Sequence, residues 1–249
     1  MEGGNFFKNS QIIILGICIA VATIVSSVIL SQGFLKVMKF TREQITVTGS
    51  AQMDIKSDYI DWKGSFSRRN LDMKTAYTEL KADLEKVKQY IKDRKVKDDE
   101  VIISPVYTVT LYKPNEKGFD TNEIEGYRLS QDIEIRSADV DRITQVSREA
   151  TELIDQGIQF ESSAPEYYYK KIDDLKIEML AKATLNAKER AANMAKATGN
   201  KIGFIRSAKM GVFQITPINS TDVSDWGVND TTSLEKKVTA VVSVSFAIE

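Results

Sequence analysis

The chain has 249 residues, a length sufficient for one large domain or two small domains with a buried core. Its 34 basic and 35 acidic residues give a formal net charge of −1, so it lacks the strong positive charge of a nucleic-acid-binding protein. Histidine is absent, which excludes Ser-His-Asp and Cys-His catalytic groups and His-ligated metal sites. The single cysteine, Cys18, excludes an intrachain disulfide. We expect no cofactor and no nucleic-acid partner.

The amino-terminal region predicts a membrane anchor. Residues 11–31 form an uncharged apolar run, and about 20 helical residues cross the ~30 Å hydrocarbon core of a bilayer. Residues 1–10 precede this run as a short tail, and residues 32–43 follow it as a juxtamembrane linker. A cleaved signal peptide is the alternative, but the run exceeds the usual ~7–15 apolar residues and no clear cleavage site follows it. We expect an uncleaved transmembrane helix that contacts the lipid bilayer through residues 11–31.

The charges beside the anchor bear on its orientation. Lys36, Lys39 and Arg42 follow the apolar run, whereas only Lys8 precedes it. The positive-inside rule therefore favours a cytoplasmic location for the large domain, although a bias of two or three charges is weak and long domains translocate regardless of it.

Two segments of alternating apolar and polar residues come next, at 44–55 and 59–69. The polar stretch 56–58 separates them, so the pair predicts a β-hairpin. Gly49 lies on the apolar face of the first segment, which indicates close packing or a bulge within that strand.

The rest of the chain alternates helical and strand patterns. In chain order the predicted elements are helix 71–94, strands 100–112 and 124–136, helix 139–155, strand 158–169, helix 172–198, strand 203–215, a long loop 216–235 and strand 237–248. Strand 59–69 with the next three elements forms one β-α-β-β unit, and the elements from 158 onward form another. We expect an α+β fold of two β-α-β-β units, with mostly antiparallel sheets packed on helices, over residues 44–249 and preceded by one transmembrane helix.

Several short motifs in this order resemble the SIMPL-domain family. They are Val47-Thr48-Gly49, Asp58, Gly126-Tyr127, Ile133-Glu134-Ile135, Gly157, the alanine-rich stretch 181–199, Lys201-Ile202-Gly203, Pro217-Ile218 and the segment 238–249. Family members often carry a second glycine two residues after Gly49, and here that residue is Ala51. The resemblance implies an exported bacterial envelope protein, secreted or membrane-anchored, that self-associates and has a stress-related role. It implies an extracytoplasmic domain, against the charge bias, and it brings no catalytic residues.

Two groups of aspartates are candidate ligand or acid/base residues. Asp54, Asp58 and Asp61 could converge, but alternation places the first and third on polar strand faces and the second in a turn. The loop aspartates Asp222, Asp225 and Asp230 could bind Ca²⁺, although their spacing matches no EF-hand. Solvated surface positions explain both groups, and we expect no metal site.

Three further features could form contact surfaces. The segment 167–171, Tyr-Tyr-Tyr-Lys-Lys, could be a stacking patch, but alternation favours burial of Tyr168 with its neighbours half exposed. Trp226 lies in the long loop, where it either forms a contact surface or packs back onto its own domain. Ala187 and Ala191 lie on the small face of helix 172–198, which permits close approach of the chain's own sheet or of a subunit.

Three functional hypotheses follow from the sequence. The first is a non-enzymatic, single-pass membrane-anchored envelope protein that self-assembles into a homo-oligomer, with Trp226, Ala187 and Ala191 as candidate interface residues. The second is a hydrolase that uses Ser/Lys or paired-carboxylate chemistry, for which a buried cleft with a strongly perturbed pKa is the expected sign. The third is a small-ligand or ion-binding module.

Overall fold

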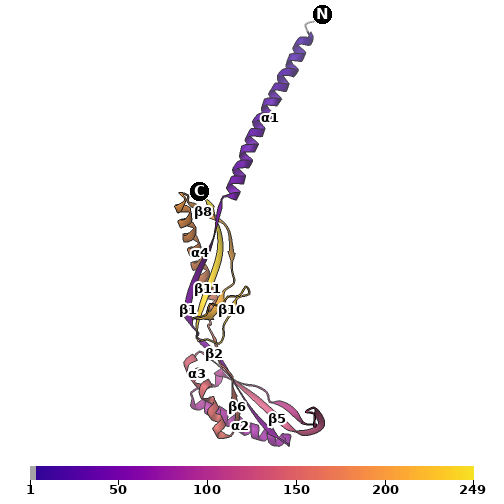
Figure 1. Ribbon diagram of the computed structural model, residues 1–249, viewed down its shortest axis with the longest axis vertical. Coiled ribbons are helices and arrows are strands. Elements are labelled where there is room, and N and C mark those ends of the chain that lie inside the picture. The colour runs from indigo at the N-terminus through magenta and orange to yellow at the C-terminus, as the bar shows by residue number, and fades with distance from the viewer. Residues whose placement is uncertain (1–3) are drawn as a thin grey trace. The chain divides into compact units, whose positions relative to one another are not determined.

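The computed structural model of the protein describes residues 4–249 (Figure 1). The chain divides into two compact units. The first unit combines Met1–Ser50, Leu180–Gly211 and Val241–Glu249, and the second combines Ala51–Met179 and Val212–Ala240.

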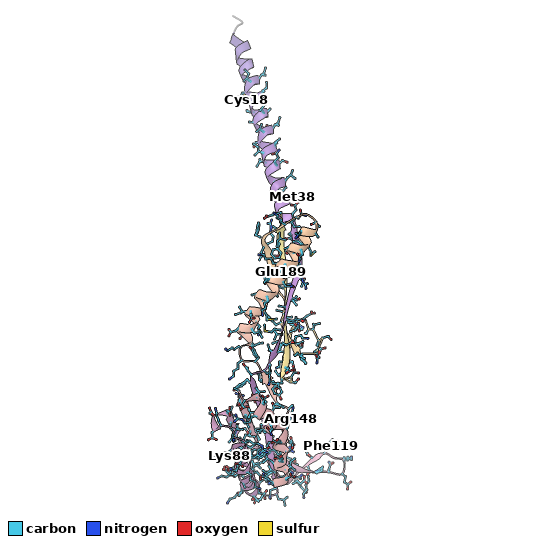
Figure 2. All side chains as sticks on the ribbon, turned by 90° about the vertical axis from the view of Figure 1, so that its left-hand side faces the viewer. Cys18, Met38, Lys88, Phe119, Arg148 and Glu189 are labelled. Carbon is cyan, nitrogen blue, oxygen red and sulfur yellow. The ribbon has the colours of Figure 1, made fainter. Side chains whose placement is uncertain are left out.

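The amino-terminal helix α1 (Gly4–Arg42) has 39 residues, so it extends beyond the predicted span 11–31 at both ends. Its stretch Ile13–Leu35 has the length and apolar composition of a membrane-spanning helix, and none of it is buried in the chain. A signal sequence can have the same length and composition. Figure 2 shows Cys18 on this exposed helix. The helix occupies part of the predicted tail and most of the predicted linker, and residues 1–3 lie outside the described residues.

The first unit contains the second half of strand β11 (Glu235–Ile248), from Val241 onward. Strand β8 (Ile202–Met210) pairs antiparallel with its second half, from Val242 opposite Met210 to Ile248 opposite Ile202. Strand β1 (Gln44–Lys56) is another neighbour of β11.

Helix α4 (Ile172–Ala197) packs on β1 through a face of small residues. The side chains at four-residue intervals along this face are fully or almost fully buried, namely Ala183, Ala187, Ala191 and Ala195.

The second unit contains a six-stranded antiparallel sheet with strand order β3-β5-β2-β6, in which β4 also pairs with β5 and β7 with β2. Its strands are β2 (Tyr59–Asn70), β3 (Val101–Ile103), β4 (Tyr107–Pro114), β5 (Asp120–Ser137), β6 (Gln159–Ser162) and β7 (Glu166–Tyr168). The β4–β5 hairpin carries Phe119 near its tip (Figure 2).

One face of this sheet carries the core of the second unit. Helices α2 (Met73–Asp93) and α3 (Val140–Glu149) pack on it, with the short 3₁₀ helices η1 (Asp98–Glu100) and η2 (Ala150–Gln156) beside them. The core joins side chains from the sheet and from both helices, including Trp62, Phe66, Leu80, Ile133 and Ile143. Strands β9 (Gln214–Pro217) and β10 (Val228–Asn229) pair in parallel in this unit, and β9 pairs antiparallel with Lys236–Thr239.

The predicted α+β class is confirmed, as are the antiparallel sheets packed on helices and the preceding apolar helix. One predicted strand pairing and one predicted grouping of a strand were wrong. β1 and β2 do not form a hairpin, because β1 belongs to the sheet of β11 and β2 pairs with β5. The polar residues between them bond elsewhere: the Ser57 amide donates to the Leu234 carbonyl (2.9 Å), and the Asp58 amide donates to the Tyr168 carbonyl (3.0 Å).

The predicted strand 158–169 also joins a different sheet. It forms β6 and β7, which both pair with β2 in the six-stranded sheet. The sheet of the second predicted β-α-β-β unit therefore contains β1 in its place. Alternation identified the buried face of each strand but not its partner.

Candidate functional site

The first group of aspartates does not form a shared site. Asp54 is exposed on β1, and Asp58 accepts a hydrogen bond from the Lys170 amide (2.8 Å). Asp61 accepts from Arg136 Nε at 3.1 Å, while its burial and the nearby Glu134 carboxylate raise its pKa. Within residues 4–249, no three acidic or cysteine side chains are grouped as a metal site would require.

The loop aspartates mostly bond to their own loop. Asp222 Oδ2 accepts from Ser220 Oγ at 2.8 Å, and Asp230 Oδ1 accepts from the backbone and hydroxyl of Thr232 at 2.9 and 2.7 Å. Burial alone would raise the pKa of Asp230, but the hydrogen bonds and the charge of Lys236 outweigh it and lower that pKa. These contacts are those of ordinary loop turns.

In the tyrosine segment, the buried and exposed side chains alternate in the opposite order from the one predicted. Tyr167 is the buried member, because it pairs with the buried Ile60 in the sheet, and its hydroxyl lies 3.1 Å from Thr144 Oγ1. Tyr168 is 37% exposed, and its hydroxyl donates to Glu166, which raises the pKa of Tyr168 to about 12. The expectation that Tyr168 is buried was therefore wrong.

The two candidate alanines contact the chain itself. Ala187 and Ala191 are fully buried, and a Cβ atom added to Gly49 would lie 2.7 Å from Ala187 Cβ. Two polar contacts hold the same surfaces together: Asn186 Oδ1 accepts from the Ser50 amide (3.2 Å), and Arg190 donates to the Thr48 carbonyl (3.0 Å). The small face of α4 thus allows close packing on β1 within the first unit.

Trp226 is the most exposed large apolar side chain in the part of the chain that the structure describes. It is 95% exposed, and Val223 in the same loop is 81% exposed. The loop is nevertheless ordered by Gln214, whose buried side chain donates to the Ser224 carbonyl (2.7 Å) and accepts from the Ser224 amide (3.3 Å). Gly227 closes the turn with φ +87°, and its amide donates to the same carbonyl at 3.1 Å. The loop therefore holds an indole in solvent on a defined backbone.

Lys236 is a lysine that the fold buries. It is 3% exposed, and its ammonium donates to the Tyr167 carbonyl at 2.6 Å and to the Asp230 carbonyl. Burial lowers its pKa. Sequence reasoning missed this residue, although it lies two positions before the buried Val238 and so in phase with the buried face of β11.

The hydrolase hypothesis would require a nucleophile beside this lysine. The hydrogen bonds described for Lys236 go to backbone carbonyls, which places it as a bridge between β7 and the loop before β11. Ser57 has a buried hydroxyl without a hydrogen-bond partner, and neither described hydrogen bond of the Lys236 ammonium goes to it. This arrangement supports a structural role for the lysine.

Replacing Lys236 with methionine should lower the free energy of unfolding by about 2 kcal/mol, because two buried carbonyl oxygens lose a charged donor. The pKa of Lys236 is lower in the folded state than in the unfolded state, so unfolding takes up protons. Wild-type stability should therefore rise relative to Lys236→Met as pH increases toward ~10.5. Urea denaturation from pH 7 to 10.5 measures this difference, and a pH-independent difference would contradict it.

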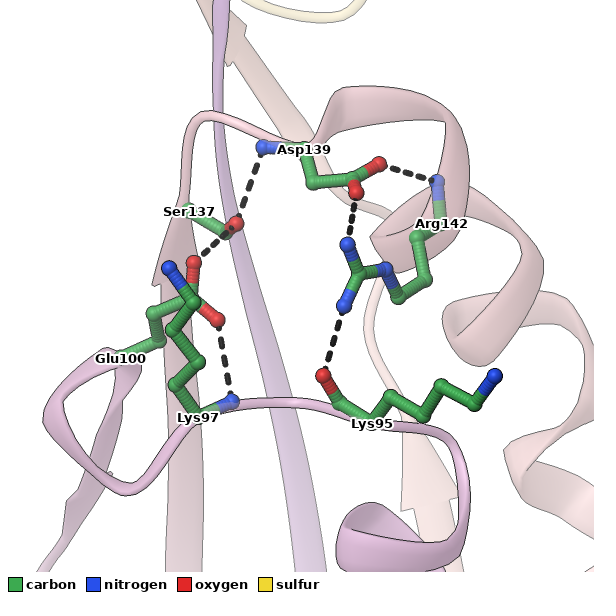
Figure 3. A network of polar contacts seen from close by, with 6 residues as sticks. All are labelled: Lys95, Lys97, Glu100, Ser137, Asp139 and Arg142. Carbon is green, nitrogen blue, oxygen red and sulfur yellow. Dashed lines mark hydrogen bonds and ion pairs between the residues drawn. The ribbon is translucent and has the colours of Figure 1, made fainter.

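A network of polar groups joins the end of α2 to the start of α3 (Figure 3). Ser137 Oγ donates to Glu100 at 2.6 Å and accepts from the Asp139 amide at 2.9 Å, and Arg142 donates to Asp139 and, at 2.6 Å, to the Lys95 carbonyl. The bond from Arg142 lowers the pKa of Asp139, which also caps α3. The members drawn are Lys95, Lys97, Glu100, Ser137, Asp139 and Arg142.

This network borders a hollow of about 630 Å³ that is lined mainly by polar residues, among them Lys56 and Asp141. The lining carries both positive and negative side chains, which include an ion pair of 3.5 Å between these two residues. The polar groups of the network bond to one another within the chain. The network therefore holds the end of α2 and the start of α3 together.

The comparisons with solved structures give only distant likenesses. A de novo designed protein, Foldit4, is 14% identical with a TM-score of 0.20, over 41% of this chain and 93% of that one. An amidase of the hydantoinase/carbamoylase family from Burkholderia phymatum is 11% identical with a TM-score of 0.26, over 57% of this chain and 37% of that one.

The family comparison covers most of the chain. No curated protein matches the sequence. The model of the SIMPL family, described as a protein of unknown function (DUF541), matches residues 45–246, which include nearly all of β1 and most of β11. The chain belongs to the SIMPL family.

Proposed function

We propose that the protein is a non-enzymatic, membrane-anchored protein of the bacterial envelope whose extracytoplasmic folded part associates with other copies of the chain. The observation that carries this proposal is Trp226, which is 95% exposed on a loop ordered by Gln214. A large apolar side chain held in solvent on a preformed loop is typical of the central residue of a protein interface.

The anchor makes weak contacts effective. Helix α1 contains a 23-residue apolar stretch that can insert in a bilayer. Copies confined to one membrane meet at a high effective concentration, so a small interface around one aromatic residue suffices for assembly.

The described charged groups support a structural rather than a catalytic role. Lys236, the buried lysine, donates to backbone carbonyls, and the carboxylates of Asp61 and Asp83 are bonded to arginines. These contacts account for the buried charges without a substrate.

Replacing Trp226 with alanine should weaken self-association at least about 30-fold, the effect of losing ~2 kcal/mol at a central interface residue. The full-length protein in detergent is measured by light scattering over a range of concentrations. Phe119→Ala is the matched control, because Phe119 is an exposed aromatic residue (67%) at another loop tip and its loss should leave association unchanged. A wild-type protein that stays monomeric at every concentration would contradict the proposal.

A further inference from the structure

We propose that one end of the first unit binds the anionic lipid headgroups of the membrane in which α1 is inserted. This surface, the juxtamembrane face, consists of residues 196–206 together with Glu43 and Glu249. It contains the last turn of α4, the loop after it and the start of β8. The inference rests on the membrane insertion of α1, which the proposed function includes, but it does not depend on contact between copies.

The folded part of the first unit follows the anchor without a linker. The apolar stretch ends at Leu35, α1 continues to Arg42, and β1 begins at Gln44. The helix beyond Leu35 rises about 10 Å. The polar headgroup region adds roughly 5–8 Å on each side of the hydrocarbon core of a bilayer. Glu43 therefore leaves the membrane at about the height of the headgroups, and the residues bonded to it lie within reach of lipid.

Backbone hydrogen bonds join Glu43 to the rest of the juxtamembrane face. The Ile248 amide donates to the Glu43 carbonyl at 3.4 Å. The next residue, Glu249, exchanges two backbone hydrogen bonds of 2.8 Å with Lys201, which lies between α4 and β8 (Figure 1). The end of α4 and the start of β8 are therefore held beside the point at which the chain leaves the anchor.

The side chains of this region carry a strong excess of positive charge. Residues 196–206 contain three cations and no acidic residue, and the end of α1 adds three more cations. Glu43 and Glu249 supply the two carboxylate side chains, so the net side-chain charge is +4, although the whole chain has a net charge of −1. The cations are Lys36, Lys39, Arg42, Lys196, Lys201 and Arg206. This charge is complementary to an anionic membrane surface.

The chemistry of the juxtamembrane face fits a lipid surface better than a soluble anion. Lys196 and Lys201 are exposed, and among the described residues no ion pair engages either ammonium, so both can donate to lipid phosphates. Phe204 is 53% exposed in the same segment, and the guanidinium carbon of Arg206 lies 4.6 Å from the centre of its ring. Exposed aromatic and basic side chains together are typical of protein surfaces at the membrane interface.

Headgroup binding also accounts for the cations that follow the anchor. The positive-inside rule takes Lys36, Lys39 and Arg42 as a sign of a cytoplasmic domain. If the same residues bind lipid headgroups together with Lys196 and Lys201, their position reflects contact with the membrane surface and not the direction of insertion.

Fluorescence from the loop after α4 tests this contact in the full-length protein. In the variant Cys18→Ser/Asn200→Cys, an environment-sensitive dye is attached at the exposed position 200, next to Lys201. The protein is placed in nanodiscs of phosphatidylcholine, with or without phosphatidylglycerol. We expect a blue shift of the dye emission in the anionic discs. The shift should disappear as salt shortens the screening length from ~10 Å at 0.1 M to ~3 Å at 1 M.

Removing the two lysines identifies the groups that bind the headgroups. Lys196→Gln/Lys201→Gln should lower the ratio of lipid-bound to free juxtamembrane face about 25-fold, or about fivefold for each lysine. The variant Lys196→Arg/Lys201→Arg keeps the charges and should keep the shift. Lys209→Gln is the matched control, because Lys209 is also exposed but lies eight residues, or about 26 Å, from Lys201 along β8.

The outcomes separate the inference from the proposed function. No shift in anionic discs, an equal shift in neutral discs, or a shift that survives Lys196→Gln/Lys201→Gln overturns the inference while the anchor stands. A shift caused by inorganic phosphate in neutral discs would show a site for soluble anions and also overturns it. Protein that does not remain with the discs on flotation overturns both the anchor and the inference. Light scattering in detergent measures self-association separately from all of these.

Discussion

Replacing Gly49 with alanine should lower the free energy of unfolding by about 3 kcal/mol, at the upper end of the usual cost of overpacking a core. The added Cβ atom would lie 2.2 Å from the Ala183 carbonyl oxygen and 2.5 Å from the Ala187 amide nitrogen. Both are backbone atoms of α4, so the clash cannot be relieved by a side-chain rotation. The helix must move away from β1, which opens the contact between them.

Hydrogen exchange locates this effect. Because Gly49, Ala183 and Ala187 all belong to the first unit, the amides of α4 in this region should exchange faster in Gly49→Ala than in the wild type. Gly33→Ala is the control, since no atom lies within 4 Å of the Cβ that it adds. A loss of less than about 1 kcal/mol in Gly49→Ala would contradict the close packing of α4 on β1.

Replacing Asp83 with alanine should destabilise the second unit by about 4 kcal/mol, because it leaves a partly buried arginine without its partner. The side chain of Asp83 is 2% exposed and accepts two hydrogen bonds from Arg68, one from Nη2 at 2.8 Å and one from Nε. Arg68 lies on β2 and Asp83 on α2, so the pair joins the helix to the sheet.

A double-mutant cycle measures the pair itself. The cycle compares the wild type with Asp83→Leu, Arg68→Met and the double variant, which should be less destabilised than Asp83→Leu, since apolar groups of similar volume replace both charges. Urea denaturation followed by the fluorescence of Trp62, which is 1% exposed in the core of this unit, gives the three free energies. Additive effects of the two single substitutions would show that the pair contributes little.

Features set by neighbouring residues were predicted well from the sequence. The apolar periodicity of 71–94 matches α2, which begins after Asp72, whose side chain accepts from the Thr75 amide. The predicted helix 139–155 corresponds to α3 followed by η2, which ends at Gly157 in the left-handed conformation common at helix termini (φ 78°). Gly49 also lies where its place on an apolar face indicated, in close contact with another element.

Features set by distant residues were not predicted. β1 lies next to β11, although the two strands stand at opposite ends of the sequence that follows α1. The alternation of residues within a strand carries no information on such a distant partner. The phase of Tyr167 and Tyr168 was wrong because β7 has only three residues, and its pairing with β2 determines which side chain is buried.

The candidate site was predictable only in part. The position of Trp226 in a polar loop suggested a contact surface, but the two hydrogen bonds between Gln214 and Ser224 that order the loop join residues ten positions apart. The order of this loop therefore emerged only from the folded structure.

The accessibility of Trp226 to a soluble quencher tests most directly whether copies of the chain meet at this residue. In full-length Trp62→Phe protein, Trp226 is the remaining tryptophan, and acrylamide quenching is followed as the protein-to-detergent ratio rises. We predict strong quenching in dilute protein, then a loss of quenching and a blue shift of emission as light scattering reports association. If Trp226 stays fully quenchable in the associated protein, assembly does not cover it and the account is contradicted.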